Sequence, residues 1–243
     1  MDNSQLVIIT GANGGIGSAV LQHCLQNSYS CCAIIRDTSK LQKSALDAVD
    51  NSDVLLHVFS YDSTAEKHFP LLFNCVHSVT LVLCAFQIAP LAHIIDLNEK
   101  DAAQNIQSNL IQMIQLIIRV ARLCSQRKIR LHIVNLDSGA AYRPIDGWGL
   151  YSAAKAYIDM FLQTLQTEES CVSVVLYDPG VVDTAMQAAI RGADKSQFSQ
   201  VEIFRRYFQE NQLRSPQAVA ANIYARYIQE WRAVDLREKF VQQ

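Results

Sequence analysis

The chain has 243 residues, of which 50% are hydrophobic and 18% charged, and its formal net charge is -2 at pH 7. This length suits one α/β domain spanning residues 1–243, and the composition allows a large buried core. A nearly neutral chain has no electrostatic attraction to nucleic acid or to an anionic membrane surface, so neither is an expected partner.

The seven cysteines lie mostly in apolar runs, with no CxxC pair and no His–Cys spacing typical of zinc. We therefore expect reduced thiols in a cytoplasmic protein and no metal. The N-terminus has no basic region ahead of an apolar stretch, so no signal peptide is expected. The most apolar run, residues 79–92, is too short to span a bilayer.

Short apolar runs alternate with longer helical patterns, as is typical of βαβ units. In chain order, the sequence predicts a strand at 6–9, a helix at 18–26, strands at 31–35, 54–59 and 79–85, a helix at 102–125, a strand at 130–136, a helix at 151–166, a strand at 172–177 and a helix opening at Ser215-Pro216. This order predicts an α/β fold with one Rossmann-type, doubly wound parallel sheet of six to seven strands and helices on both faces.

The irregular segment 183–214 follows the sixth strand. It has room for short helices.

A glycine-rich loop, TGANGGIG at residues 10–17, follows the first strand and opens a helix. Glycines let a pyrophosphate approach the backbone, and the helix N-terminus offers unpaired N–H groups, so nucleotide binding is favoured over an ordinary turn. No Gly-Lys-Ser/Thr ends the loop, which excludes a Walker loop. The candidate cofactor contacts are Thr10, Gly11, Asn13, Gly15, Ile16 and Gly17.

Cofactor choice depends on the residues after the second and third strands. Arg36 follows the second strand, and a guanidinium suits a 2′-phosphate, which favours NADP(H) over NAD(H). The alternative is that Arg36 only solvates the strand end. Asp62 follows the third strand and is either an acceptor for the adenine amino group or an ordinary loop aspartate.

Tyr151 and Lys155 lie four residues apart near the start of a helix, so their side chains share one face. An ammonium close to a phenol lowers the phenol's pKa, and the helix N-terminus favours the phenolate further. We therefore expect Tyr151 to be a general acid near neutral pH. Ser138 follows the fifth strand and is placed to polarise a substrate carbonyl. Asn109 is either part of a water relay to Lys155 or an exposed helix residue.

These motifs occur in the order found in the short-chain dehydrogenase/reductase family. TGANGGIG, Asn109, Ser138, the Tyr151-xxx-Lys155 pair and DPGVVDT at 178–184 resemble that family, closest to its sepiapterin reductase and benzil reductase branch. The resemblance implies that Tyr151 is the acid/base, that Lys155 also binds the nicotinamide ribose, and that Ser138 orients the carbonyl. It also implies that Asn109 serves the proton relay and that Pro179, Gly180, Val182 and Thr184 line the nicotinamide. Analogy with the family implies that segment 183–214 is the substrate loop, and that Trp148 and the apolar residues of this segment form an apolar wall over the nicotinamide. A homodimer or homotetramer through the two long helices is implied too.

Two departures from the family pattern concern the site. The loop after the fourth strand reads Leu83-Cys84-Ala85-Phe86 where the family has Asn-Asn-Ala-Gly. Ala85 and Phe86 should therefore approach the cofactor, and we expect the Phe86 ring to turn into the core. The C-terminal residues 232–243 lack the family's glycine before the last strand, so the sequence does not support pterin recognition.

The sequence thus predicts an NADPH-dependent carbonyl reductase that acts on a ketone or vicinal dicarbonyl, with Ser138, Tyr151 and Trp148 contacting a small-molecule carbonyl substrate. Two alternatives remain: a 3-oxoacyl thioester reductase, and a catalytically weak NADP(H)-binding regulatory protein.

Overall fold

The computed structural model describes residues 5–38, 55–65, 68–233 and 235–240. Among these residues, seven parallel strands form one sheet in the order β3-β2-β1-β4-β5-β6-β7. The strands are β1 (Gln5–Thr10), β2 (Ser30–Ile34), β3 (Leu56–Phe59), β4 (Ser78–Leu83), β5 (Arg130–Leu136), β6 (Val172–Asp178) and β7 (Arg237–Lys239). The doubly wound parallel sheet predicted from the sequence is confirmed. Val54, at the start of one predicted strand, lies outside the described residues.

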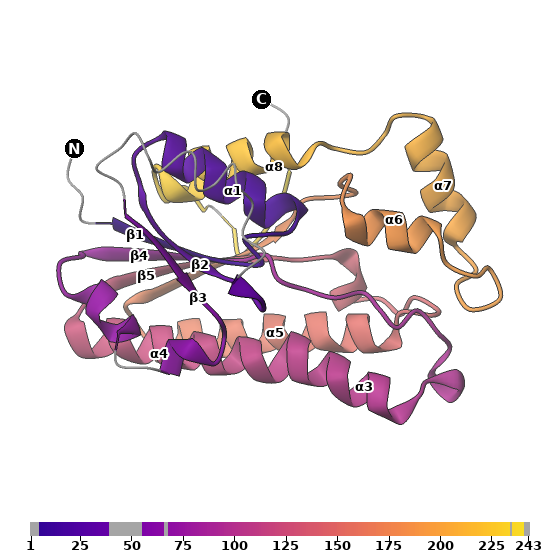
Figure 1. The fold of residues 1–243 in the computed structure, drawn as a ribbon, viewed down its shortest axis with the longest axis horizontal. Helices are drawn as coiled ribbons and strands as arrows, with labels where there is room; N and C mark the ends of the chain where they lie inside the picture. Colours follow the sequence, from indigo (N-terminus) through magenta and orange to yellow (C-terminus); the bar gives the residue numbers. More distant parts are fainter. Residues whose placement is uncertain (1–4, 39–54, 66–67, 234, 241–243) are drawn as a thin grey trace.

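Helices cover both faces of the sheet (Figure 1). On one face lie α1 (Gly15–Gln26) and α8 (Pro216–Ile223), and on the other lie α3 (Glu99–Ile106), α4 (Gln112–Arg127) and α5 (Gly149–Glu168). Two further helices, α6 (Ala185–Arg191) and α7 (Val201–Gln209), lie within the segment 183–214. No helix among the described residues is long and apolar enough to cross a membrane.

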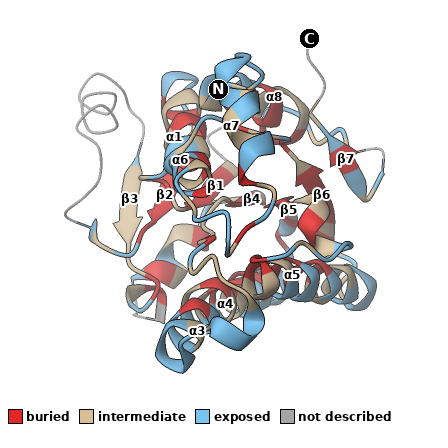
Figure 2. Ribbon diagram, turned by 90° about the vertical axis from the view of Figure 1, so that its right-hand side faces the viewer, coloured by how far each residue is buried: buried red, intermediate tan, exposed pale blue. Residues whose placement is uncertain are grey.

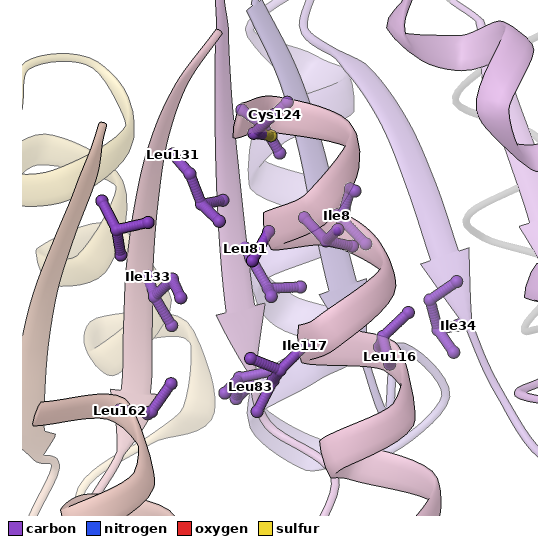
Figure 3. Close-up of a cluster of buried hydrophobic side chains, with 14 of the residues drawn as sticks. Ile8, Ile34, Leu81, Leu83, Leu116, Ile117, Cys124, Leu131, Ile133 and Leu162 are labelled. Atoms are coloured by element: carbon purple, nitrogen blue, oxygen red, sulfur yellow. The ribbon is translucent and has the colours of Figure 1, made fainter. Parts of the chain in front are cut away.

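The core forms two apolar layers, one on each face of the sheet, and Figure 2 shows the buried strands between exposed outer helix surfaces. In register across the strands, Cys32, Ile8, Leu81, Ile133 and Val174 form one buried row. Alternate strand residues point to opposite faces, so this row faces α4 and α5 (Figure 3). Strands buried on both faces need apolar residues at nearly every position, which explains the continuous runs in the sequence.

The long helix predicted at 102–125 is present, but its helical path is not uniform. Between α3 and α4, residues Gln107–Ile111 form a π-helical turn, η5. The buried apolar residues of α4 recur at helical spacing and pack on the sheet. The π turn contains Asn109, and such turns occur frequently at functional sites.

The C-terminal part of the fold contains one element that sequence reasoning had not located. Strand β7 pairs with β6 through Leu176 and Arg237, so residues 237–239 form the edge of the sheet. The predicted helix start at Ser215-Pro216 is present, because Ser215 Oγ accepts a hydrogen bond from the Ala218 N–H (3.1 Å).

We expect Leu81→Ala to lower the free energy of unfolding by about 2–5 kcal/mol, since it leaves a cavity in the middle of the central strand. Leu81 is completely buried, and it lies between Ile8 and Ile133 in the row above. Urea denaturation would measure the loss. The matched control is Ile95→Ala at a side chain that is 92% exposed, where the change should stay within about 0.5 kcal/mol. Equal effects of the two substitutions would contradict the observed packing.

Candidate active site

The glycine loop crosses the carboxyl ends of the central strands. Gly11 has a φ of +63°, and a Cβ there would stand 2.9 Å from Ala85 Cα, so only glycine fits. The Gly11 N–H donates to the Ile34 carbonyl (2.9 Å), which ties the loop to the end of β2. Helix α1 then begins at Gly15 with no side chain capping its N-terminus. Its first N–H groups are therefore available to an anion.

An open cleft of about 160 Å³ lies beyond the carboxyl ends of β1, β2 and β4. Sequence reasoning had selected six of its lining residues: Gly11, Asn13, Arg36, Ala85, Phe86 and Asn109. It had missed Tyr61, Gln87 and Ser108, among others. Tyr61 rather than Asp62 lines the cleft, and Asp62 is exposed in the turn after β3. Asp62 as a cofactor contact stays a prediction.

Arg36 lies at the rim of this cleft, where sequence reasoning had placed it. Its guanidinium contacts the Gln87 side-chain amide, and with that amide turned to satisfy both groups, Gln87 Oε1 accepts from Arg36 Nη2 at 3.2 Å. Arg36 is exposed, so a ligand phosphate can approach it from solvent. Gln87 follows β4, and no sequence motif marked it.

Tyr151, Ser138 and Lys155 come together at the carboxyl end of β5. Tyr151 and Lys155 lie one turn apart on α5, and both are buried. Ser138 caps a short 3₁₀ turn, and its hydroxyl is near enough to the Tyr151 phenol to lower the pKa of that phenol. Lys155 Nζ donates to the carbonyl oxygen of Leu136, the last residue of β5. The set named from the sequence therefore forms one cluster.

Burial decides the protonation of this cluster. It raises the pKa of Tyr151 well above its ordinary value, Ser138 opposes the rise, and the carboxylates of Asp137 and Asp178 add to it. Burial also lowers the pKa of Lys155 to about 8, against the attraction of nearby carboxylates. The expectation that Lys155 and the helix N-terminus would lower the Tyr151 pKa is therefore not met in this structure, because desolvation is the largest effect.

Asn109 holds the loop after β4. Its side chain is buried, its Nδ2 donates to the Gln87 carbonyl (2.8 Å), and its Oδ1 accepts from the Gln87 N–H (2.9 Å). A second bond runs from Nδ2 to Asn105 Oδ1 (3.2 Å). The exposed-residue alternative is excluded, and the asparagine fixes the backbone beside the cleft.

Phe86 packs at the edge of the core but lies against Tyr151 and Lys155, so its ring is not fully turned into the core as expected. The Lys155 Nζ lies 3.8 Å from the centre of its ring, and the Tyr151 ring meets it edge-on at 5.5 Å. The ring is half-buried and packs at the edges of two apolar clusters. A cation over a phenyl face is attracted to it, which explains why the ring takes this position.

The segment after β6 approaches the glycine loop. A Cβ on Gly15 would stand 2.6 Å from Thr184 Cγ2, so the Thr184 side chain can lie against residue 15 only because that residue is glycine. Thr184 caps α6, accepting from the Gln187 N–H (3.3 Å). Pro179 and Val182 are buried, while Gly180 is exposed at a φ of +69°. Ile16, half-buried, packs on the α1 side of the core.

Trp148 forms part of an apolar cluster beside Tyr151, as sequence reasoning had proposed. Its ring lies 5.5 Å from that of Tyr151 and stacks on Phe198 at 5.3 Å, with Phe204 at 5.6 Å. Phe198 and Phe204 belong to the segment 183–214 and were not named individually from the sequence. The apolar spacing of α7, which includes Val201 and Phe204, was the available signal.

Within the described residues, no group of three or more His, Cys, Asp or Glu side chains is arranged to hold a metal ion.

The chain is similar to known oxidoreductases along its length. The short chain dehydrogenase family model matches residues 5–195. Benzil reductase ((S)-benzoin forming) of Bacillus subtilis (strain 168) is 30% identical over 233 residues, which cover 90% of this chain and 91% of that protein. Sepiapterin reductase of Rattus norvegicus is 49% identical over 59 residues, covering 24% of this chain and 22% of that protein.

Two solved structures show the same fold. The KRED1-Pglu enzyme superposes with a TM-score of 0.78 at 24% identity, covering 91% of this chain and 95% of its own. The closed form of serine dehydrogenase complexed with NADP+ has a TM-score of 0.75 at 19% identity, covering 97% and 94%.

The low pKa of Lys155 should make stability depend on pH. The folded chain releases the Lys155 proton near pH 8, whereas the unfolded chain keeps it to about pH 10.4. Between these values the unfolded state binds more protons, so this group makes stability rise with pH by about 1.4 kcal/mol per pH unit.

Lys155→Met removes that contribution. We expect the difference in unfolding free energy between the native protein and this variant to rise from pH 8 to pH 10, measured by urea denaturation at each pH. A difference that stays constant over this range would show that Lys155 has an ordinary pKa.

Proposed function

Because this chain belongs to the short-chain dehydrogenase family, we propose that it is an NADPH-dependent carbonyl reductase with Tyr151 as the general acid. The family makes it an oxidoreductase acting between CH–OH and C=O groups with a nicotinamide cofactor. The observation that carries the proposal is the meeting of Ser138, Tyr151 and Lys155 at the carboxyl end of β5, next to the glycine-loop cleft.

The residues of the cleft fit a dinucleotide. Gly11 and Gly15 leave room where any side chain would collide, and the uncapped start of α1 offers N–H groups to a pyrophosphate. Arg36 would exchange its contact with Gln87 for a 2′-phosphate. Lys155 would hydrogen bond the nicotinamide ribose once the Phe86 ring gives way. When bound, NADPH supplies the hydride; the serine dehydrogenase of the same fold binds NADP+.

Tyr151 is suited to donate a proton because burial keeps it protonated. A raised pKa leaves the phenol intact at neutral pH, as an acid for carbonyl reduction requires. Ser138, which lies near the Tyr151 phenol, would donate to the same carbonyl oxygen and hold it in place. The Lys155 ammonium then stabilises the phenolate that remains after the proton has moved to the product alkoxide.

The substrate side favours a compact aromatic or vicinal dicarbonyl. Trp148, Phe198 and Phe204 present aromatic surface beside Tyr151, and the Bacillus subtilis relative is a benzil reductase. The 3-oxoacyl thioester reductase is the second enzyme candidate.

Phe86 favours one further candidate, a regulatory NADP(H)-binding protein. Its ring covers the ammonium that would bind the nicotinamide ribose, so the described conformation must change before the cofactor can reach Lys155. A weak enzyme would result if that change cost much of the binding energy.

An oligomer through α4 and α5 is also part of the proposal. Ile118 on α4 and Tyr157 and Met160 on α5 are apolar side chains that are 40%, 49% and 64% exposed. Exposed apolar groups gathered on adjacent helices are typical of an interface between subunits.

Cofactor preference tests Arg36. We expect NADPH to bind more tightly than NADH by about 1.5–3 kcal/mol, the scale of charge-assisted hydrogen bonds, and Arg36→Ala to remove most of the difference. Fluorescence titration with both cofactors would measure it. Arg232→Ala, at an exposed arginine paired with Glu230, is the control and should keep the preference. Equal affinities in the native protein would refute the NADP(H) assignment.

The catalytic proposal is tested by NADPH oxidation across aromatic vicinal diketones, simple ketones and acyl thioesters. We expect the highest kcat/KM on a diketone, and about a 10²–10⁴-fold lower kcat in Tyr151→Phe. Tyr157→Phe, at an exposed tyrosine of the same helix, is the control.

A mutant that keeps most of its turnover would remove Tyr151 from the mechanism. Faster turnover of an acyl thioester would favour the second enzyme. Tight NADPH binding with no turnover on any carbonyl would favour the regulatory protein.

A further inference from the structure

A cluster of charged side chains lies beneath the catalytic lysine. Asp137 follows β5, Asp159 lies on α5 one turn after Lys155, and Arg237 opens β7. Both aspartates are buried, with side chains only 3% exposed, while the Arg237 side chain is 42% exposed. Three elements distant in sequence therefore bring these charges together.

Hydrogen bonds hold both carboxylates of the cluster in place. Arg237 Nη1 donates to Asp137 Oδ2 (2.7 Å) and to Asp159 Oδ2 (2.9 Å). Asn135 Nδ2 donates to Asp159 Oδ1 (3.0 Å), and the Ser138 N–H donates to Asp137 Oδ1 (2.6 Å). All four carboxylate oxygens thus accept a hydrogen bond, so neither aspartate is free to turn away.

The cluster is directed at Lys155. The lysine Nζ donates to the carbonyl of Leu136, the residue before Asp137. Asp159 stands four residues after Lys155 on the same buried face of α5. The carboxylates of Asp137 and Asp159 both favour the charged form of the lysine.

The charges of the cluster balance. A buried ammonium is costly unless opposite charges lie near it, and the carboxylates of Asp137 and Asp159 attract that of Lys155. Those carboxylates would repel each other if nothing else were present; Arg237 bridges them and supplies the second positive charge. Two cations and two anions then share the site. Tyr142, whose ring lies 5.3 Å from the Arg237 guanidinium, supports the bridge from the outside.

We propose that Asp137 and Asp159, bridged by Arg237 of the C-terminal strand, are positioning residues that hold the Lys155 ammonium charged and in place beside Tyr151. The inference rests on the proposed function for the roles of Lys155 and Tyr151. It assigns a role to the C-terminal strand: its first residue completes the support of a catalytic group on α5.

Other titratable groups also face this cluster, and the test must separate them. Lys155 is approached by Cys84 after β4 and by Asp178 at the end of β6, in addition to the two aspartates. The pKa of Asp159 is raised to about 6, chiefly by burial and then by Asp137, and it is lowered by Arg237. The titration of Lys155 itself is therefore the direct measurement.

The experiment follows the lysine 13Cε resonances by NMR from pH 6.5 to 11, with Lys155→Met to assign the signal. Asp159→Asn removes one negative charge, so we expect the Lys155 pKa to fall by about one unit. Arg237→Gln removes one positive charge, so we expect that pKa to rise. The double variant should return it close to the native value, because one charge of each sign has been removed.

A merely structural role would move both single variants in the same direction. The proposal is overturned if Asp159→Asn leaves the Lys155 titration unchanged, or if both substitutions lower its pKa. Glu238→Gln is the matched control: Glu238 is a buried carboxylate of the same strand, bonded to Arg226 and Tyr227, and its loss should leave Lys155 unchanged. Should Asp159→Asn fail to fold, Asp137→Asn makes the same test.

Turnover provides the second measurement. If Lys155 must be protonated, a lower pKa shifts the alkaline limb of the kcat profile of Asp159→Asn to lower pH, and an unshifted limb contradicts the proposal. The NMR titration needs no turnover. A native protein that reduces no carbonyl would therefore overturn the proposed function, while the Lys155 titration would still decide the role of the charge cluster.

Discussion

The loops that follow β1 and β4 touch each other, and the rest of the site depends on that contact. Gly11 takes a φ of +63° against Ala85, whose N–H donates to Thr10 Oγ1 at 3.0 Å. The strand order places β1 beside β4 at the point where the sheet changes its direction of winding, which is where such folds bind ligands. Because the two loops are in contact, Phe86 and the loop held by Asn109 border the same cleft as the glycine loop.

Burial then determines the chemistry available at this place. Desolvation raises the pKa of Tyr151 and lowers the pKa of Lys155. The pair therefore differs from a phenol in water, whose pKa a neighbouring ammonium would lower. Lys155 stays positively charged at this buried place only if nearby groups stabilise its ammonium. The Phe86 ring approaches it from one side, and Asp137 and Asp159 favour its charged form. The protonation of Tyr151 and the charge of Lys155 therefore depend on the same few buried groups.

Some site residues could not have been selected from the sequence, for identifiable reasons. Tyr61 and Asp62 are neighbours in the turn after β3. Only the path of the turn decides that Tyr61 is the one that lines the cleft. Gln87 contacts Arg36, and the Asn109 side chain fixes the backbone of Gln87 in this position. No rule based on sequence spacing predicts this contact. The direction of Phe86 was likewise open, since both the apolar core and the Lys155 ammonium attract an aromatic ring.

The sequence by itself determined the fold class, the glycine loop and the shared face of Tyr151 and Lys155. These follow from local rules: apolar runs form buried parallel strands, glycine permits the turn at Gly11, and residues four apart meet on a helix. The bridge from Arg237 to Asp137 and Asp159 was decided only by the tertiary structure. It spans 100 and 78 residues of sequence and exists because β7 pairs with β6 in a register that places Arg237 beside the end of β5. Contacts over such distances depend on strand order and register, which a periodic pattern does not specify.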